Sequence, residues 1–124
     1  MKIKALVVDQ RSVERNELTG PLKRIGVRKI VEVNVETLLA QPFRTGDFDA
    51  VFIEFNTLME AGRGLTKSLR EMDGQVPIIM TYPQSVSLAD LQRYCPDASA
   101  YLMMPFATEQ LLETVEQHVF EGAG

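Results

Sequence analysis

The sequence predicts an α/β fold, with one doubly wound parallel sheet of five strands and five helices. The first observation is a set of short, almost continuously apolar runs: Ala5–Val8, Val51–Ile53, Ile78–Met80 and Ala100–Met103. The second is that helical patterns separate these runs. Strands without polar alternation are typical of a parallel sheet that helices cover on both faces. At 124 residues, the chain is predicted to be one domain, residues 1–124, large enough to bury a core.

The first two strand–helix units lie before residue 42. Strand Ile3–Val8 leads to a helix that begins near Ser12 and ends at Gly26. Strand Lys29–Val33 precedes a short helix, for which Asn34 is a suitable N-cap.

The third strand is predicted at Ala50–Phe55. The stretch Asn56–Gly64 contains two glycines and little periodicity, which predicts a long loop. The following helix has apolar residues at helical spacing, namely Leu65, Leu69 and Met72.

Two further units complete the order. Strand Val76–Thr81 is followed by a helix with a predicted capping box at Ser87 and Asp90. Strand Ala100–Met103 is followed by a last helix that buries Leu111, Leu112, Val115 and Val119. Residues 121–124 are predicted to fray.

Composition narrows the possible functions. A net charge of −4 argues against general binding of nucleic acids, and no apolar run is long enough to span a bilayer. Met1–Lys4 does not have the layout of a signal peptide. Cys95 is the only cysteine, which excludes an intrachain disulfide and a thiolate metal cage. These observations predict a cytoplasmic protein that interacts with neither membranes nor nucleic acids.

The functional residues are expected where the strands end. Ligands of such sheets bind outside the carboxyl ends of the strands. Three apolar runs lead into Asp9, Glu54 and Thr81, and the fourth leads into Met104 and Pro105. This crevice is therefore predicted to hold two carboxylates and a hydroxyl, while no Lys, Arg or His stands on these strand ends.

Four motifs, in this order and spacing, resemble those of response-regulator receiver domains of the CheY-like kind. They are Val7–Asp9, Asp49–Glu54, Ile78–Thr81 and Tyr101–Phe106, and the resemblance covers essentially the whole chain. It implies a flavodoxin-like (βα)5 topology and a role in bacterial two-component signal transduction. Receivers of the usual kind accept a phosphoryl group on an aspartate, bind Mg²⁺ with an acidic pair, and pair the new charge with a lysine.

This chain departs from the family pattern where the chemistry lies. Glu54 occupies the phosphoacceptor position, and Asp9 is followed by neutral Gln10 where the second acid is expected. Met104 occupies the lysine position. The switch positions are kept, as Thr81 and Tyr101. The resemblance also implies that the Met104–Pro105 bond is cis.

These replacements predict weak or absent Mg²⁺ binding, with Asp9, Glu54 and Asn56 as the only, weak, candidate ligands. Mg²⁺ prefers carboxylates in near-octahedral geometry, and Gln10 removes one charge. Phosphoryl transfer depends on cations that neutralise the transferring oxygens, and Met104 supplies none.

Glu54 has two interpretations. In one, its carboxylate accepts a hydrogen bond from Thr81 and mimics the phosphorylated state, with Arg11 or Arg63 as the missing cation. In the other, it is a leftover polar residue that points to water. Similarly, Tyr82 either covers the crevice entrance or packs on the neighbouring helix.

The leading hypothesis is a degenerate receiver: a protein-interaction module that is not an enzyme, has no cofactor and acts without phosphorylation. The partner would be a histidine kinase, a phosphotransfer protein or an output domain. A homodimer through the fourth helix, fifth strand and fifth helix is a further possibility. One alternative is a receiver that retains divalent-ion binding and slow phosphoacceptance. The other is a small flavodoxin-like enzyme or nucleotide-binding domain. The loop Asp9–Ser12 argues against it, because this loop has no glycine-rich phosphate cradle.

Overall fold

Residues 3–9 and 12–121 are described by the computed structural model, without the side chains of residues 12–16 and 121. The predicted fold class is confirmed: five parallel strands form one sheet in the order β2-β1-β3-β4-β5. The strands are β1 (Lys4–Val8), β2 (Lys29–Val33), β3 (Ala50–Glu54), β4 (Ile78–Pro83) and β5 (Ala100–Met104).

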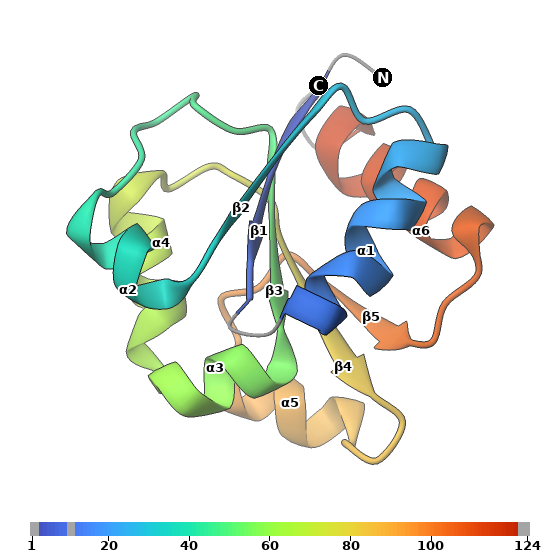
Figure 1. Ribbon diagram of the computed structural model, residues 1–124. Coiled ribbons are helices and arrows are strands. Elements are labelled where there is room, and N and C mark those ends of the chain that lie inside the picture. Colours follow the sequence, from blue (N-terminus) through green and yellow to red (C-terminus); the bar gives the residue numbers. More distant parts are fainter. Residues whose placement is uncertain (1–2, 10–11, 122–124) are drawn as a thin grey trace.

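Helices cover both faces of this sheet (Figure 1). The helices are α1 (Ser12–Arg24), α2 (Val35–Ala40), α3 (Phe55–Ala61), α4 (Gly64–Met72), α5 (Leu88–Tyr94) and α6 (Thr108–Val115), and the π-helix η1 (Glu116–Glu121) continues α6. Helices α1 and α6 pack on one face, and α2 to α5 pack on the other. No helix in the described residues is both long and apolar enough to cross a membrane.

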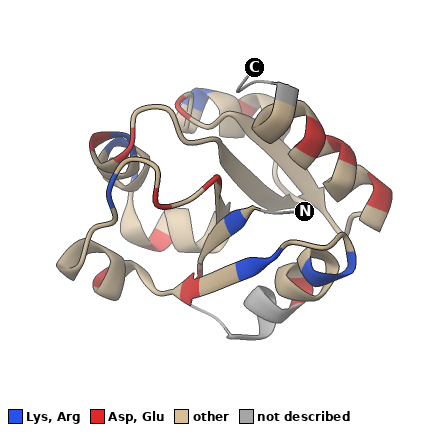
Figure 2. Cartoon of the chain, turned by 90° about the horizontal axis from the view of Figure 1, so that it is seen from above, with Lys and Arg blue, Asp and Glu red and all other residues tan. Residues whose placement is uncertain are grey.

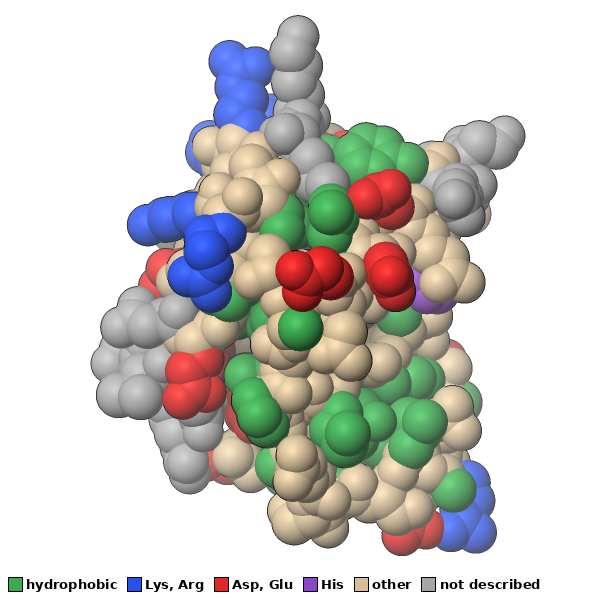
Figure 3. All heavy atoms as spheres, turned by 90° about the vertical axis from the view of Figure 1, so that its right-hand side faces the viewer, with side chains coloured by type: hydrophobic (Ala, Val, Ile, Leu, Met, Phe, Trp, Pro, Cys, Tyr) green, Lys and Arg blue, Asp and Glu red, His purple; other side chains and the backbone are tan. Residues whose placement is uncertain are grey.

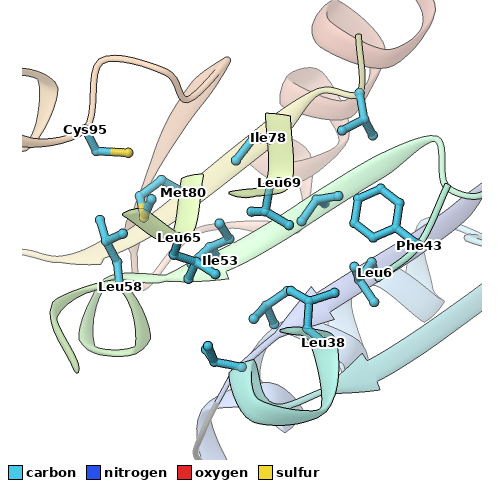
Figure 4. Packing of buried hydrophobic residues seen from close by; sticks show 14 of the residues in the cluster. Leu6, Leu38, Phe43, Ile53, Leu58, Leu65, Leu69, Ile78, Met80 and Cys95 are labelled. Carbon is cyan, nitrogen blue, oxygen red and sulfur yellow. The ribbon is translucent and has the colours of Figure 1, made fainter. Parts of the chain in front are cut away.

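The central strands are apolar throughout because both of their faces are buried. In β3, Val51 and Ile53 belong to the core beneath α2 to α5, whereas Ala50 and Phe52 belong to the core beneath α1 and α6. All four are fully buried. Figure 4 shows Ile53 packed among leucines of α3 and α4. Cys95 joins this same core, as a small buried residue.

One predicted loop is a helix. The stretch Asn56–Gly64 was expected to be irregular, but α3 occupies Phe55–Ala61. Glu54 caps its first turn, Leu58 is fully buried against the sheet, and Gly62 ends it with φ 89°. A left-handed backbone at that position favours glycine. Gly62, which was interpreted as part of a loop, is therefore the residue that ends a helix. The structure therefore has six α-helices in its described residues, where five were predicted.

The other boundaries differ by one or two residues. Strand β4 begins at Ile78 instead of Val76 and continues to Pro83, because its pairing with β5 runs as far as Met104. The last helix changes to π-helical geometry after Val115 and extends through Glu121. Residue 121, predicted to fray, is thus helical; residues 122–124 lie outside the described part.

Charge is distributed unevenly at the amino-terminal end of the sheet (Figure 2). Basic residues lie on β1, on β2 and at the end of α1, whereas α6 carries acidic residues. The exposed basic residues here are Lys4, Lys23, Arg24, Arg28 and Lys29. Edge strand β2 exposes Lys29 and Glu32, charges that discourage pairing with a further strand.

Candidate functional site

A crevice of about 140 Å³ lies at the carboxyl ends of the strands. Strand register brings its parts together, since Glu54 is paired with Thr81 and Pro83 with Met104. The sequence-predicted residues that line it are Asp9, Glu54, Asn56, Thr81 and Met104, joined by Val7, Val8, Glu17, Leu18 and Pro83. Gln10 lies outside the described residues.

Asp9 is buried, with 2% of its surface exposed. Its backbone N–H donates to the carbonyl of Val33, which extends the ladder between β1 and β2. Its carboxylate Oδ1 accepts a hydrogen bond from the Thr57 hydroxyl at 3.3 Å. A buried carboxylate needs such donors because desolvation penalises its charge.

Glu54 is half-buried at the end of β3 and acts as the N-cap of α3. Its Oε2 accepts a hydrogen bond from the backbone N–H of Thr57 at 3.1 Å. One of the two interpretations of Glu54 required a hydrogen bond from the Thr81 hydroxyl to its carboxylate. The Thr81 hydroxyl instead donates to the backbone carbonyl of Ile53, at 3.5 Å. Glu54 is therefore neither a phosphate mimic bonded to Thr81 nor a carboxylate that simply points to water.

Arg63 does not supply the missing cation. Its guanidinium lies over the ring of Tyr94, 4.5 Å from the ring centroid, and it forms no ion pair with Glu54. Arg11, the other candidate, falls outside the described residues. Among the described residues that line the crevice there is no Lys, Arg or His.

Met104 lines the crevice where the family pattern has a lysine, and the Met104–Pro105 peptide bond is cis, as predicted. Tyr82 does not cover the entrance. It is 7% exposed and packs in the core with Leu91 and Cys95, because alternation along β4 turns it away from the face that carries Thr81.

The described side chains of the crevice include the three residues expected as weak Mg²⁺ ligands. Asp9, Glu54 and Asn56 line the same crevice, but Thr57 contacts both carboxylates and Asn56 contributes no charge. Within residues 3–9 and 12–121, no group of three or more His, Cys, Asp or Glu side chains is arranged to hold a metal ion. Mg²⁺ requires oxygen ligands in near-ideal octahedral geometry.

Tyr101 lies away from the crevice. Its phenol donates a hydrogen bond to the backbone carbonyl of Cys95 at 2.6 Å, at the end of α5. The ring packs against the core beneath α2 to α5 and is half-buried. Thr81 and Tyr101 are thus each bonded to a main-chain carbonyl.

Burial raises the pKa of the Cys95 thiol above its ordinary 9.0 and that of the Tyr101 phenol above its ordinary 10.0. The folded chain then keeps protons that the unfolded chain releases, so both groups stabilise the fold fully below about pH 9. We expect the free energy of unfolding, measured by urea denaturation, to fall as pH rises above 9. The double variant Cys95→Ala, Tyr101→Phe should lose stability less steeply over this range. Equal slopes for the two proteins would contradict this expectation.

Two residues at the site were not predicted. Thr57 lay in a presumed loop, so no periodicity pointed to it. Glu17 belongs to α1 and lines both the crevice and a neighbouring groove of about 500 Å³. Its position beside Leu18, which faces the sheet, is the only sequence signal that places it near the strand ends.

Comparison with known proteins agrees with this geometry. No protein-family model matches the chain. A signal receiver domain of a two-component histidine kinase from Clostridium thermocellum superposes with a TM-score of 0.79 at 16% identity, covering 97% of this chain and 99% of that chain. The receiver domain of a Pseudomonas aeruginosa sensor histidine kinase, with magnesium ion coordinated in its active-site cleft, gives 0.75 at 18% identity, covering 96% and 98%. The chain has the receiver-domain fold.

Comparison of sequences also finds relatives of this chain. The sensory transduction protein LytR of Staphylococcus haemolyticus is 27% identical over 117 residues, which are 93% of this chain but 44% of LytR. The chain therefore spans about half the length of the curated relatives it matches.

Proposed function

We propose that this receiver-fold domain is a protein-interaction module of two-component signalling that works without phosphorylation. The observation that carries the proposal is the state of the crevice. Glu54, in the phosphoacceptor position, is engaged as a helix cap, Asp9 accepts from Thr57, and Met104 replaces a lysine.

Phosphoryl transfer is disfavoured by this arrangement on electrostatic grounds. Catalysis of such a transfer consists of positioning together with cations that neutralise the developing charge. The described lining offers three carboxylates, those of Asp9, Glu17 and Glu54, and no basic group. A single lost donor of this kind typically reduces the rate about 10²–10³-fold.

The switch positions support the same conclusion. A hydroxyl that senses phosphate must be able to turn toward it, whereas the Thr81 hydroxyl donates a hydrogen bond to the Ile53 carbonyl. The Tyr101 phenol is held by Cys95 at the end of α5. The domain would then present one fixed arrangement of α5 and β5 to its partner.

The proposed partner surface comprises α5, β5 and α6. Leu88 of α5 and Met103 of β5 are large hydrophobic residues with 41% and 46% of their surfaces exposed. Figure 3 shows hydrophobic side chains gathered on the lower half of this side of the molecule, with acidic side chains above them. The exposed acids of α6 and η1 are Glu109, Glu113 and Glu116.

The partner is a histidine kinase, a phosphotransfer protein, an output domain or a second copy of this domain. A second proposed surface is the face of α1, the helix that contains Arg15; Arg11 lies outside the described residues. The domain itself is proposed to be non-enzymatic and cytoplasmic, and to bind neither nucleic acid nor membrane.

Incubation with acetyl phosphate and Mg²⁺ tests this proposal. We expect no phosphoryl adduct in intact-mass spectra, and no change in the amide NMR spectrum when beryllofluoride is added. A receiver that accepts phosphate in the usual way, run in parallel, controls for the reagents. A stoichiometric adduct on the native chain would instead establish the alternative, a slow phosphoacceptor.

A further inference from the structure

Thr57 contacts both carboxylates of the crevice. It is the third residue of α3, and 1% of its surface is exposed. Its backbone N–H donates to Glu54 at 3.1 Å, while its hydroxyl donates to Asp9 at 3.3 Å. Asp9 and Glu54 follow the paired residues Val8 and Ile53 of neighbouring strands β1 and β3. One residue thus joins the ends of two strands to one helix.

Helix α3 depends on such contacts for its stability. It has seven residues, which is too short to be stable alone in water. Its described attachments are the Glu54 cap, the Thr57 hydroxyl, and the fully buried side chain of Leu58. Leu58 supplies non-directional apolar burial, whereas Thr57 supplies the directional bonds that fix how the helix begins.

We propose that Thr57 is a positioning residue that holds the Asp9 and Glu54 carboxylates at the crevice and fixes α3 on the sheet. This rests on the proposed function, because a domain switched by metal and phosphate needs these oxygens accessible. Thr57 brings one hydrogen-bond donor to each of two acids on neighbouring strands. Through these two bonds, Thr57 connects α3 to the carboxyl ends of β1 and β3; we call this connection the Thr57 joint.

The first test separates the hydroxyl of Thr57 from its methyl group. Thr57→Val keeps the shape and removes the donor, whereas Thr57→Ser keeps the donor and removes the methyl. We expect Thr57→Val to speed amide hydrogen exchange in α3 about tenfold relative to α2, since a buried acceptor loses its bond. Thr57→Ser should leave the exchange close to that of the native chain. A larger effect of Thr57→Ser than of Thr57→Val would show a packing role and overturn the proposal.

A second variant removes the acceptor of the Thr57 backbone amide. Glu54→Ala removes the acceptor for the Thr57 amide but leaves Thr57 itself in place. Loss of an N-cap should also speed exchange in α3 about tenfold. If α3 exchanged at the native rate in both Glu54→Ala and Thr57→Val, the joint would have no function in fixing the helix.

Titration with MgCl₂ alone tests whether the Thr57 hydroxyl competes with a cation for the Asp9 carboxylate. Thr57→Val removes one hydrogen-bond donor from the Asp9 carboxylate, so the thermal midpoint of this variant should rise with Mg²⁺ while that of the native chain and of Thr57→Ser stays constant. Equal responses of the three proteins would overturn this part. Failure of the proposed function is a separate result, namely a phosphoryl adduct on the native chain, and the comparison of exchange rates is independent of it.

Discussion

The triple variant Gln10→Asp, Glu54→Asp, Met104→Lys is expected to accept phosphate from acetyl phosphate in the presence of Mg²⁺, whereas the native chain does not. Met104 and Glu54 line the same crevice as Thr81, so the new groups would face one another. The changes restore the acidic pair, the acceptor and the cation of the family pattern. The lysine alone should contribute about 10²–10³-fold to the rate of adduct formation.

Position 103 provides a matched control for the lysine. Met103 is adjacent in sequence but is 46% exposed, is paired with Tyr82, and is absent from the crevice lining. Replacing Met104→Lys by Met103→Lys in the triple variant should leave labelling at least about a hundredfold slower, as judged by intact mass against time. Replacing Glu54→Asp by Glu54→Asn should abolish the adduct. Equal labelling with lysine at either position would refute the proposed importance of the residue at position 104.

The largest expected loss of stability from a polar residue is at Arg70 of α4. Its Nη1 donates to the carbonyl of Val76 at 2.6 Å, and its Nη2 donates to the carbonyl of Asp97 at 3.1 Å and to Ser99 Oγ at 3.2 Å. The guanidinium thus connects α4 to the segments that precede β4 and β5. Arg70→Met should lower the free energy of unfolding by about 2–4 kcal/mol, because charged donors are lost and carbonyls lose their partners.

Arg93→Met is the control for Arg70→Met. Arg93 pairs with Asp90 one turn away on α5, and its side chain is 79% exposed. Such surface pairs contribute about 0–1 kcal/mol, so this variant should unfold at nearly the native urea concentration. Similar losses for the two variants would mean that the contacts of Arg70 do not stabilise the fold.

The strands were predictable because their burial on both faces is visible as apolar runs. The short helix α3 was not, since its stabilising contacts are not periodic in sequence. The single carboxylate of Glu54 caps α3, and the same residue lines the crevice. The sequence pattern indicated only its place in the crevice. Gly62 was recognised as a special backbone position, but it ends a helix instead of relaxing a loop.

The membership of the site was largely predictable, but its hydrogen bonds were not. Asp9, Glu54, Asn56, Thr81 and Met104 all line the crevice, as the convergence of parallel strands requires. Neither interpretation of Glu54 holds, because Thr81 donates to Ile53 and Glu54 caps α3. Of the two interpretations of Tyr82, the structure shows packing in the core beside the neighbouring helix α5. Glu17 and Thr57 reach the site from helices whose orientation depends on packing.

By itself, the sequence determined the order of the five strands along the chain, the two-sided burial of the sheet, and the chemical types that meet at its carboxyl edge. These follow from residue periodicity and from the common direction of parallel strands. Only the tertiary structure decided which atoms bond: Thr57 to Asp9, Tyr101 to Cys95, and Arg70 to Val76. A hydrogen bond depends on distances and angles set within a few tenths of an ångström. Such geometry is a product of how all the helices pack on the sheet, and no single segment encodes it.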